Sequence, residues 1–238
     1  MKHNLLKSGK RKLIKSVIKF IFLLSLFNSH TVFSERVLYI GSMQSHGHTA
    51  TRKVLLSAYQ KLNITVQFVY LPAERALISS NKGVIDGEDS RIAGLEKTYH
   101  NLIPINIPIE KVNLFAYSKN KSIIIKDWYS LKPYRIAYLR GVKVIEKNLI
   151  GFNSQTVTDI KQAFMMLEHN RVDIVISDEF QAEHITDSSI NKLIPPIYSF
   201  PVFHYLNKKN RDLVPKLEAV LIQMQKNGTI DRVLNETK

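Results

Sequence analysis

The chain has 238 residues, of which 34 are Lys or Arg and 20 are Asp or Glu, so its net charge is +14. It contains no Cys, which excludes disulfide bonds, catalytic thiols and zinc sites built from cysteine. Hydrophobic residues make up 45% of the chain, an ordinary share for a globular protein.

Residues 1–34 have the pattern of a secretory signal peptide. Residues 1–19 carry seven Lys or Arg and no acidic residue, and an apolar run follows from Val17 to Phe27. Polar residues and Val32, Phe33 and Ser34 then precede a predicted cut near Ser34. Basic, apolar and small-residue regions in this order predict export, so we expect a periplasmic protein. A retained membrane anchor is the alternative, but the apolar run is shorter than the roughly 20 residues that a spanning helix needs.

Cleavage of this leader changes the meaning of the net charge. The leader carries seven of the fourteen net positive charges, so +7 remains on residues 35–238. No block of Lys or Arg outside the leader resembles a nucleic-acid-binding arm, and we expect no nucleic-acid partner. The remaining charge fits an anionic ligand, an anionic membrane surface or a merely solvated face. The Cys of a lipoprotein is missing, so we expect no lipid anchor.

Short β-branched segments alternate with longer helical patterns along residues 35–238. Strands are predicted at Arg36–Gly41, Ile64–Leu71, Val84–Gly87, Asn106–Tyr117, Arg135–Leu139, Val172–Ser177 and Tyr198–Tyr205. Helices are predicted at Ala50–Leu62, Ala73–Asn81, Ala93–His100, Val142–Leu149, Val157–His169, Glu179–Ile185 and Arg211–Val233. This order predicts βαβ units and an α/β fold with helices on both faces of a largely parallel sheet.

Two extended segments contain prolines, which a regular central strand does not tolerate. These segments are Ile103–Tyr117 and Leu193–Tyr205, and they bracket about 75 residues that have a βαβαβ order of their own. We therefore predict two lobes joined by two crossing strands. Residues 35–116 and 202–238 would form the first lobe, and residues 117–201 the second.

Four groups of motifs follow one another in the chain. They are Leu71–Leu77 with Lys82–Gly87, Leu131–Gly141, Asn170–Asp178, and Val214–Leu217 with Lys226–Ile230. Their content and order resemble the bacterial extracellular solute-binding proteins of family 3, which have the type 2 periplasmic binding protein fold. The resemblance implies two lobes with mixed, mainly parallel sheets that close around a small-molecule ligand, in a protein that is a monomer.

The loops at the carboxyl ends of the strands line the cleft in such an architecture. Ser42 and Gln44 lie in the first of these loops, Ser42–Thr49, and are candidates for contact with an anionic group near the next helix. A simple helix-capping role is the alternative. His46 and His48 lie in the same loop without a placed carboxylate nearby, and we predict no metal site there.

Arg91 is the candidate in the second loop, Asp86–Arg91. The resemblance implies an Arg in this region that holds a ligand carboxylate with two hydrogen bonds. The alternative is a salt bridge with Glu88 or Asp89. The Thr that precedes this Arg in the family is missing, as is the aromatic loop after the first strand, and both departures weaken a specific assignment to amino acids.

Three candidates lie in the second lobe. Arg140 and Gly141 follow a predicted strand, where Gly141 would permit close backbone approach and Arg140 could reach an anion. Asp178 matches the acidic residue that the family delivers to the cleft, where it would pair with a ligand ammonium. Its alternative role is to cap the helix that begins near Glu179.

These residues favour a binding protein and not an enzyme. The leading hypothesis is capture of a small polar solute, amino-acid-like or another small anion or zwitterion, for an ABC importer with an inner-membrane permease. The alternatives are a ligand-sensing accessory that docks on a membrane receptor and, less favoured, a periplasmic enzyme on the same fold. No phosphate loop, nucleophile elbow or metal-protease spacing is present, so we predict no catalytic residues and no cofactor.

Overall fold

A computed structural model of the chain describes residues 36–43, 49–182, 185 and 189–236. The predicted leader, its cleavage site, Gln44, His46 and His48 lie outside the described residues. Among the described residues, no helix is both long enough and apolar enough to cross a membrane.

A βαβαβ unit with parallel strands forms the sheet of the first lobe. Its elements are, in chain order, β1 (Val37–Met43), α2 (Thr49–Gln60), β2 (Thr65–Leu71), α3 (Ala73–Asn81) and β3 (Gly87–Arg91). The apolar residues of α2 recur at helical spacing, and Leu55 and Tyr59 are fully buried in one core with Ile40 of β1. Burial of this helical face holds α2 against the sheet.

A second parallel unit forms the other lobe. Its elements are β6 (Ile136–Leu139), α4 (Lys143–Asn148), β7 (Ser154–Val157), α5 (Ile160–Glu168), β8 (Ile174–Asp178) and α6 (Glu179–Ala182). Helix α5 begins three residues after the predicted start at Val157, which belongs to β7. Asp159 caps the helix by accepting a hydrogen bond from the backbone N–H of Lys161 at 3.0 Å. Ala163, Phe164 and Leu167 lie on its buried face.

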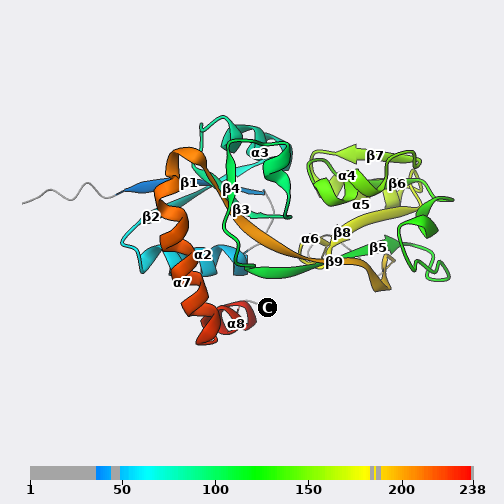
Figure 1. The fold of residues 1–238 in the computed structure, drawn as a ribbon. Helices are drawn as coiled ribbons and strands as arrows, with labels where there is room; N and C mark the ends of the chain where they lie inside the picture. Colours follow the sequence, from blue (N-terminus) through cyan, green and yellow to red (C-terminus); the bar gives the residue numbers. More distant parts are fainter. Residues whose placement is uncertain (1–35, 44–48, 183–184, 186–188, 237–238) are drawn as a thin grey trace, which may run out of the picture. The chain divides into compact units, whose positions relative to one another are not determined.

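Two long strands connect the lobes, as Figure 1 shows. β5 (Glu110–Ser118) and β9 (Asn191–Asn207) run antiparallel to each other. β9 continues into the first sheet, where it pairs with β3 and with β4 (Leu102–Pro104), and β5 pairs with β8 of the second. Every antiparallel pair among the described strands includes β5 or β9. The sheets are thus mixed because parallel units meet two crossing strands, and the predicted fold class is confirmed. The predicted boundaries at residues 116 and 201 fall inside β5 and β9, and they stay predictions.

The chain ends with η4 (Lys208–Leu213), α7 (Val214–Lys226) and α8 (Thr229–Asn235), where one helix was predicted. The break falls at Gly228, whose φ of 70° lies in the left-handed region. The predicted helix Ala93–His100 is wrong as well, since only a 3-10 turn, η2 (Leu95–Lys97), forms there. One further short turn is η3 (Tyr129–Leu131).

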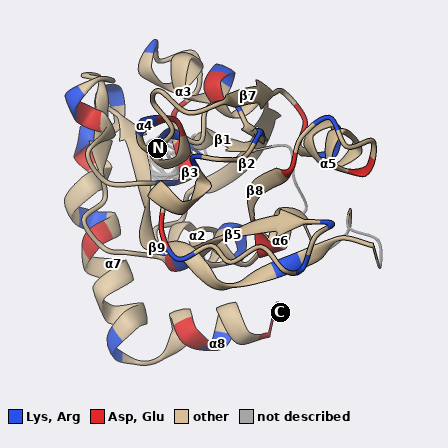
Figure 2. Cartoon of the chain, turned by 90° about the vertical axis from the view of Figure 1, so that its right-hand side faces the viewer, with Lys and Arg blue, Asp and Glu red and all other residues tan. Residues whose placement is uncertain are grey.

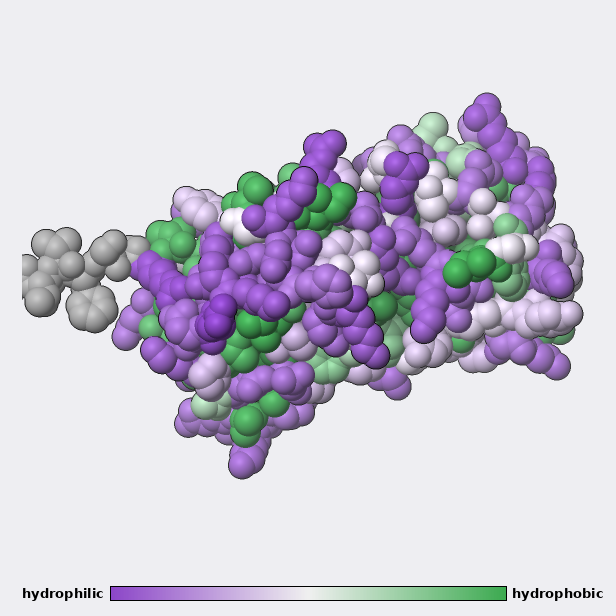
Figure 3. Space-filling view, turned by 45° about the horizontal axis from the view of Figure 1, so that its top comes forward, coloured by the Kyte–Doolittle hydropathy of each residue, from purple (hydrophilic) through white to green (hydrophobic). Residues whose placement is uncertain are grey.

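The surface carries mixed charge and small hydrophobic groups. In the view of Figure 2, Lys and Arg are interspersed with Asp and Glu, on α7 for example. In the view of Figure 3, hydrophobic residues form separate small groups within a mainly hydrophilic surface. In Figure 2 the Lys and Arg residues are spread over several elements, as on an ordinary solvated surface.

Candidate functional site

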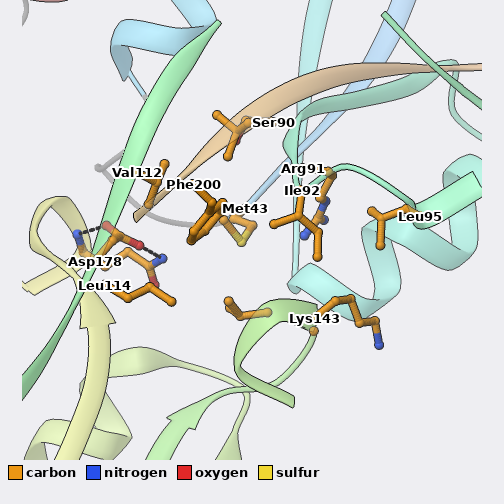
Figure 4. Close-up of a pocket in the computed structure, with 14 residues that line it drawn as sticks. Met43, Ser90, Arg91, Ile92, Leu95, Val112, Leu114, Lys143, Asp178 and Phe200 are labelled. Carbon is orange, nitrogen blue, oxygen red and sulfur yellow. Dashed lines mark hydrogen bonds between the residues drawn. The ribbon is translucent and has the colours of Figure 1, made fainter. Parts of the chain in front are cut away.

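A small cavity lies where the two lobes meet the crossing strands (Figure 4). Its volume is about 50 Å³. The residues that line it come from both lobes and from both crossing strands: Met43, Ser90, Arg91, Ile92, Leu95, Val112, Leu114, Gly141, Val142, Lys143, Asp178, Gln181, Phe200 and Val202. Pockets for drug-sized ligands hold roughly 300–1,000 Å³, so this conformation has room for only a very small group.

Most of the wall is apolar because of strand alternation. Val112 and Leu114 are two residues apart on β5, and Phe200 and Val202 are two residues apart on β9, so each pair presents its side chains to the same face of the sheet. Met43, at the end of β1, adds a flexible side chain from the first lobe. The few polar groups in this apolar wall therefore dominate its chemistry.

Asp178 lies at the carboxyl end of β8, opposite Leu114 of β5, and is only 4% exposed. One carboxylate oxygen accepts a hydrogen bond from the backbone N–H of Gln181 at 2.9 Å, and the other accepts one from the Gln181 side-chain amide at 2.5 Å. Asp178 therefore caps α6 and lines the cavity at once, so the two roles considered from the sequence are compatible. Its contact with a ligand stays a prediction.

Arg91 lines the cavity with its charge already paired. Its Nε and Nη2 atoms donate to one oxygen of Glu88 at 2.8 and 2.6 Å, and Nη2 also donates to the carbonyl of Ala73 at 2.9 Å. The other oxygen of Glu88 accepts from the hydroxyl of Ser80. Burial raises the pKa of Glu88, against the opposing effects of Arg91 and Ser80. The salt bridge considered as the alternative for Arg91 is present, and its contact with a ligand stays a prediction.

The placement of this pair corrects one expectation from the sequence. Residues 88–91 were predicted as a loop after the strand Val84–Gly87, but they belong to strand β3, and all five residues of that strand are buried. The polar sequence of β3 is tolerated because its charged side chains, Glu88, Asp89 and Arg91, find partners inside the protein. Arg91 is thus held on a strand between two other strands and not on an adaptable loop.

His204 of β9 lies behind Glu88 and is completely buried. Its Nδ1 lies 2.6 Å from the carbonyl oxygen of Glu88, which can only accept, so Nδ1 carries the proton. Nε2 then accepts from the hydroxyl of Tyr59 at 2.7 Å. Burial lowers the pKa of His204 to about 4, against the opposing effect of the hydrogen bond to Glu88. A neutral imidazole therefore supports the strand that carries the Arg91 pair.

Ser42 belongs to β1 and not to the loop after it, because the strand extends to Met43. Its hydroxyl donates to Asp89 at 2.5 Å and accepts from Nη1 of Arg52 at 3.1 Å. Ser42 is fully buried and does not line the cavity, whereas the adjacent Met43 does. The structure gives Ser42 partners within the protein, and any contact with a ligand stays a prediction.

Gly141 and Arg140 have different surroundings. Gly141 lines the cavity with a φ of 87°, and a Cβ atom on it would lie 2.5 Å from the backbone nitrogen of Glu74 in the first lobe. Arg140 is exposed, its Nε donates to the hydroxyl of Thr156 at 3.3 Å, and it is not part of the cavity wall. Among these two candidates, only Gly141 lies at the cavity.

Lys143 is a cavity residue that the sequence did not indicate. Its ammonium group bonds Glu74 across the cleft and Glu146 on its own helix, the latter at 2.9 Å. Burial lowers the pKa of Lys143, but these two carboxylates outweigh that effect and raise it overall. Glu74 also accepts from the hydroxyl of Tyr99 at 3.1 Å. Lys143 therefore links the lobes at the edge of the cavity.

Ser90 and Gln181 are two further polar cavity residues that the sequence reasoning missed. Ser90 Oγ and Gln181 Oε1 are buried and have no hydrogen-bond partner among the described residues. For Gln181 a signal existed, because Asp178 and Gln181 have the spacing of an N-cap residue and its N3 partner. Unpartnered buried oxygens are uncommon in proteins, and a water molecule or a polar group of a ligand could satisfy these two.

Comparison with known proteins bears on the fold. No family model matches the chain. It is 27% identical over 196 residues to an uncharacterised protein of Shewanella oneidensis, covering 76% of this chain and 73% of that protein. It is 25% identical over 138 residues to a protein of Shewanella frigidimarina described as a candidate sensor, covering 54% of this chain and only 20% of the relative.

Solved structures match over most of the chain. An ancestral arginine-binding protein bound to glutamine superimposes with a TM-score of 0.70 at 17% identity, covering 84% of this chain and 96% of that one. A histidine kinase sensor domain with similarity to periplasmic binding proteins gives 0.72 at 12% identity, covering 85% and 96%. The fold is that of a two-lobed periplasmic binding protein. The position of the cavity between the lobes agrees with this fold.

Proposed function

We propose that this chain captures a small polar solute in the cleft between its two lobes. The observation that carries the proposal is the cavity itself, which joins residues of both lobes and holds two buried oxygen atoms without partners, Ser90 Oγ and Gln181 Oε1. A ligand that bonds these atoms would favour the closed arrangement of the lobes. The similarity to an arginine-binding protein that holds glutamine supports a small ligand of this kind.

The test is thermal unfolding of the purified protein against amino acids, amines, small carboxylates, sugars and peptides. A ligand at 100 times its Kd adds about 2.7 kcal/mol of stability. For a chain of this size that is a rise in Tm of about 5–10 °C. We expect such a rise with one chemical class, and we expect Asp178→Asn to abolish it. No rise with any compound would contradict ligand capture.

Sensing is a second candidate for the output of binding, beside delivery to an ABC importer. The match to a sensor domain and the relative described as a candidate sensor both support it. Cross-linking in the producing bacterium, with ligand present, tests the choice. Recovery of a receptor with a signalling domain would support sensing, whereas recovery of an importer permease would support transport.

We further propose a periplasmic location, a monomeric state and binding without chemical turnover. The periplasmic location rests on the basic and apolar pattern of residues 1–34 and on the fold. Fractionation and light scattering test the first two proposals. Turnover is tested by incubating the protein with each ligand that raises its Tm, and recovery of a chemically altered ligand would favour an enzyme instead.

A further inference from the structure

The charges around the cavity are unequal, and this imbalance indicates a ligand class. We propose that the cleft selects a small protonated amine with an apolar body and discriminates against the matching amino acid. This inference rests on the proposed function and narrows it. It differs from the anion or zwitterion expected from the sequence, because the structure shows which charges are already paired.

Asp178 and Gln181 would hold the amine. No Lys, Arg or His among the described residues forms an ion pair with Asp178, although the carboxylate is 4% exposed. Both of its oxygens accept from Gln181, and each retains a lone pair. Because the amide of Gln181 donates to Asp178, its Oε1 remains as an unpartnered acceptor. An ammonium group supplies three hydrogen-bond donors and a positive charge, both of which the part of the cavity around Asp178 and Gln181 lacks.

A ligand carboxylate finds no free cation in the described wall. The two basic residues that line the cavity are Arg91 and Lys143. Glu88 neutralises Arg91 at 2.6 Å, and Glu74 and Glu146 flank Lys143. A carboxylate placed among these groups would lose its hydration without gaining an unpaired positive charge, which is unfavourable.

The rest of the wall suits a hydrocarbon. Leu114 and Phe200 from the crossing strands and Met43 from the first lobe face the cavity together with other apolar side chains (Figure 4). Ser90 adds one hydroxyl, which can donate or accept. Since the volume is only about 50 Å³, we expect the apolar body to be short.

Matched pairs that differ only by a carboxylate test the proposal in the purified full chain. The pairs are ethylamine and alanine, isobutylamine and valine, and 3-methylbutylamine and leucine. Calorimetry is expected to show at least tenfold tighter binding of the amine in the best pair, with the amino-acid methyl ester closer to the amine. Asp178→Asn is expected to weaken amine binding at least tenfold, and Asp231→Asn on α8 serves as the exposed control.

A variant of Glu88, the partner of Arg91, gives an independent check. Glu88→Gln leaves the charge of Arg91 uncompensated, so it is expected to raise the affinity for the amino acid relative to its amine. Circular dichroism establishes whether each variant is folded. The comparison of amine and amino-acid affinities in the wild-type protein tests the proposal even if a variant fails to fold. Tighter binding of the amino acids would overturn the ligand class and leave the proposed function standing. Failure of every amine and amino acid to bind would overturn the ligand class, and the proposed function would fall only if no compound of the thermal-unfolding panel raised the Tm either.

Discussion

Gly141→Ala should penalise the closed arrangement of the lobes. A Cβ atom at this position would lie 2.5 Å from the nitrogen of Glu74 and 2.9 Å from the carbonyl carbon of Ala73. These are backbone atoms at the start of α3, which cannot move as a side-chain tip can. Overpacking of this kind costs roughly 1–3 kcal/mol. If closure is required for binding, the apparent affinity for the ligand falls about 5- to 150-fold.

Gly151→Ala is a matched control, because Gly151 has a φ of 81° and open space around its Cα. Both variants incur the backbone cost of a left-handed residue, roughly 1–2 kcal/mol of unfolding free energy. Only Gly141→Ala adds the contact between the lobes. We expect it to weaken binding of the best amine or to enlarge the radius of gyration in small-angle scattering. Equal affinities and equal radii for the two variants would refute this account of closure.

Three further predictions concern stability. Phe164→Ala should lower the unfolding free energy by about 3–5 kcal/mol, because Phe164 is fully buried. The neighbouring residue Met165 is exposed, so Met165→Ala should change the unfolding free energy by less than about 0.5 kcal/mol. Urea denaturation measures both effects. Glu74→Gln should cost up to about 1 kcal/mol at low salt, and the loss should shrink in 1 M salt because the Lys143 pair is screened. The unfolded chain protonates His204 at an ordinary pKa and the folded chain only near 4, so stability should fall as the pH drops from 6.5 to 4. Between pH 6.5 and 5, the unfolding free energy of His204→Gln should fall by about 2 kcal/mol less than that of the wild type. An equal fall in the two proteins, measured by urea denaturation at each pH, would contradict this prediction.

Most of the helices and the crossing strands could be predicted because their signals are local. Asp159 and the apolar spacing after it determine where α5 begins. Prolines are compatible with the crossing segments and not with a regular central strand. The strand β3 could not be predicted in this way, because Glu88 and Arg91 satisfy each other and Ser80 only after the sheet has formed. A buried polar strand has the same composition as a polar loop, and only tertiary contacts distinguish them.

The candidate site was predicted in part. Asp178 is the last residue of β8 and Gly141 lies two residues after β6. Strand ends can be located from hydrophobic patterns, so both residues were found, and both line the cavity. Ser42 was predicted to lie in a loop because neither Ser42 nor Met43, the last two residues of β1, is β-branched. Gln181 was missed because its partner Asp178 had been considered singly and not as half of a capping pair.

The Arg91 pair is more than a local salt bridge, because Glu88 connects several parts of the first lobe. One carboxylate oxygen bonds Ser80 of α3, the other bonds Arg91, and the carbonyl bonds His204, which in turn bonds Tyr59 of α2. A ligand that took Arg91 away would leave the charge of Glu88 buried and uncompensated. Breaking a buried pair in this way costs roughly 3–5 kcal/mol, which corresponds to a loss of about 150- to 4,000-fold in affinity. Recognition of a carboxylate by Arg91 would have to overcome that cost, whereas recognition of an amine by Asp178 leaves the pair intact.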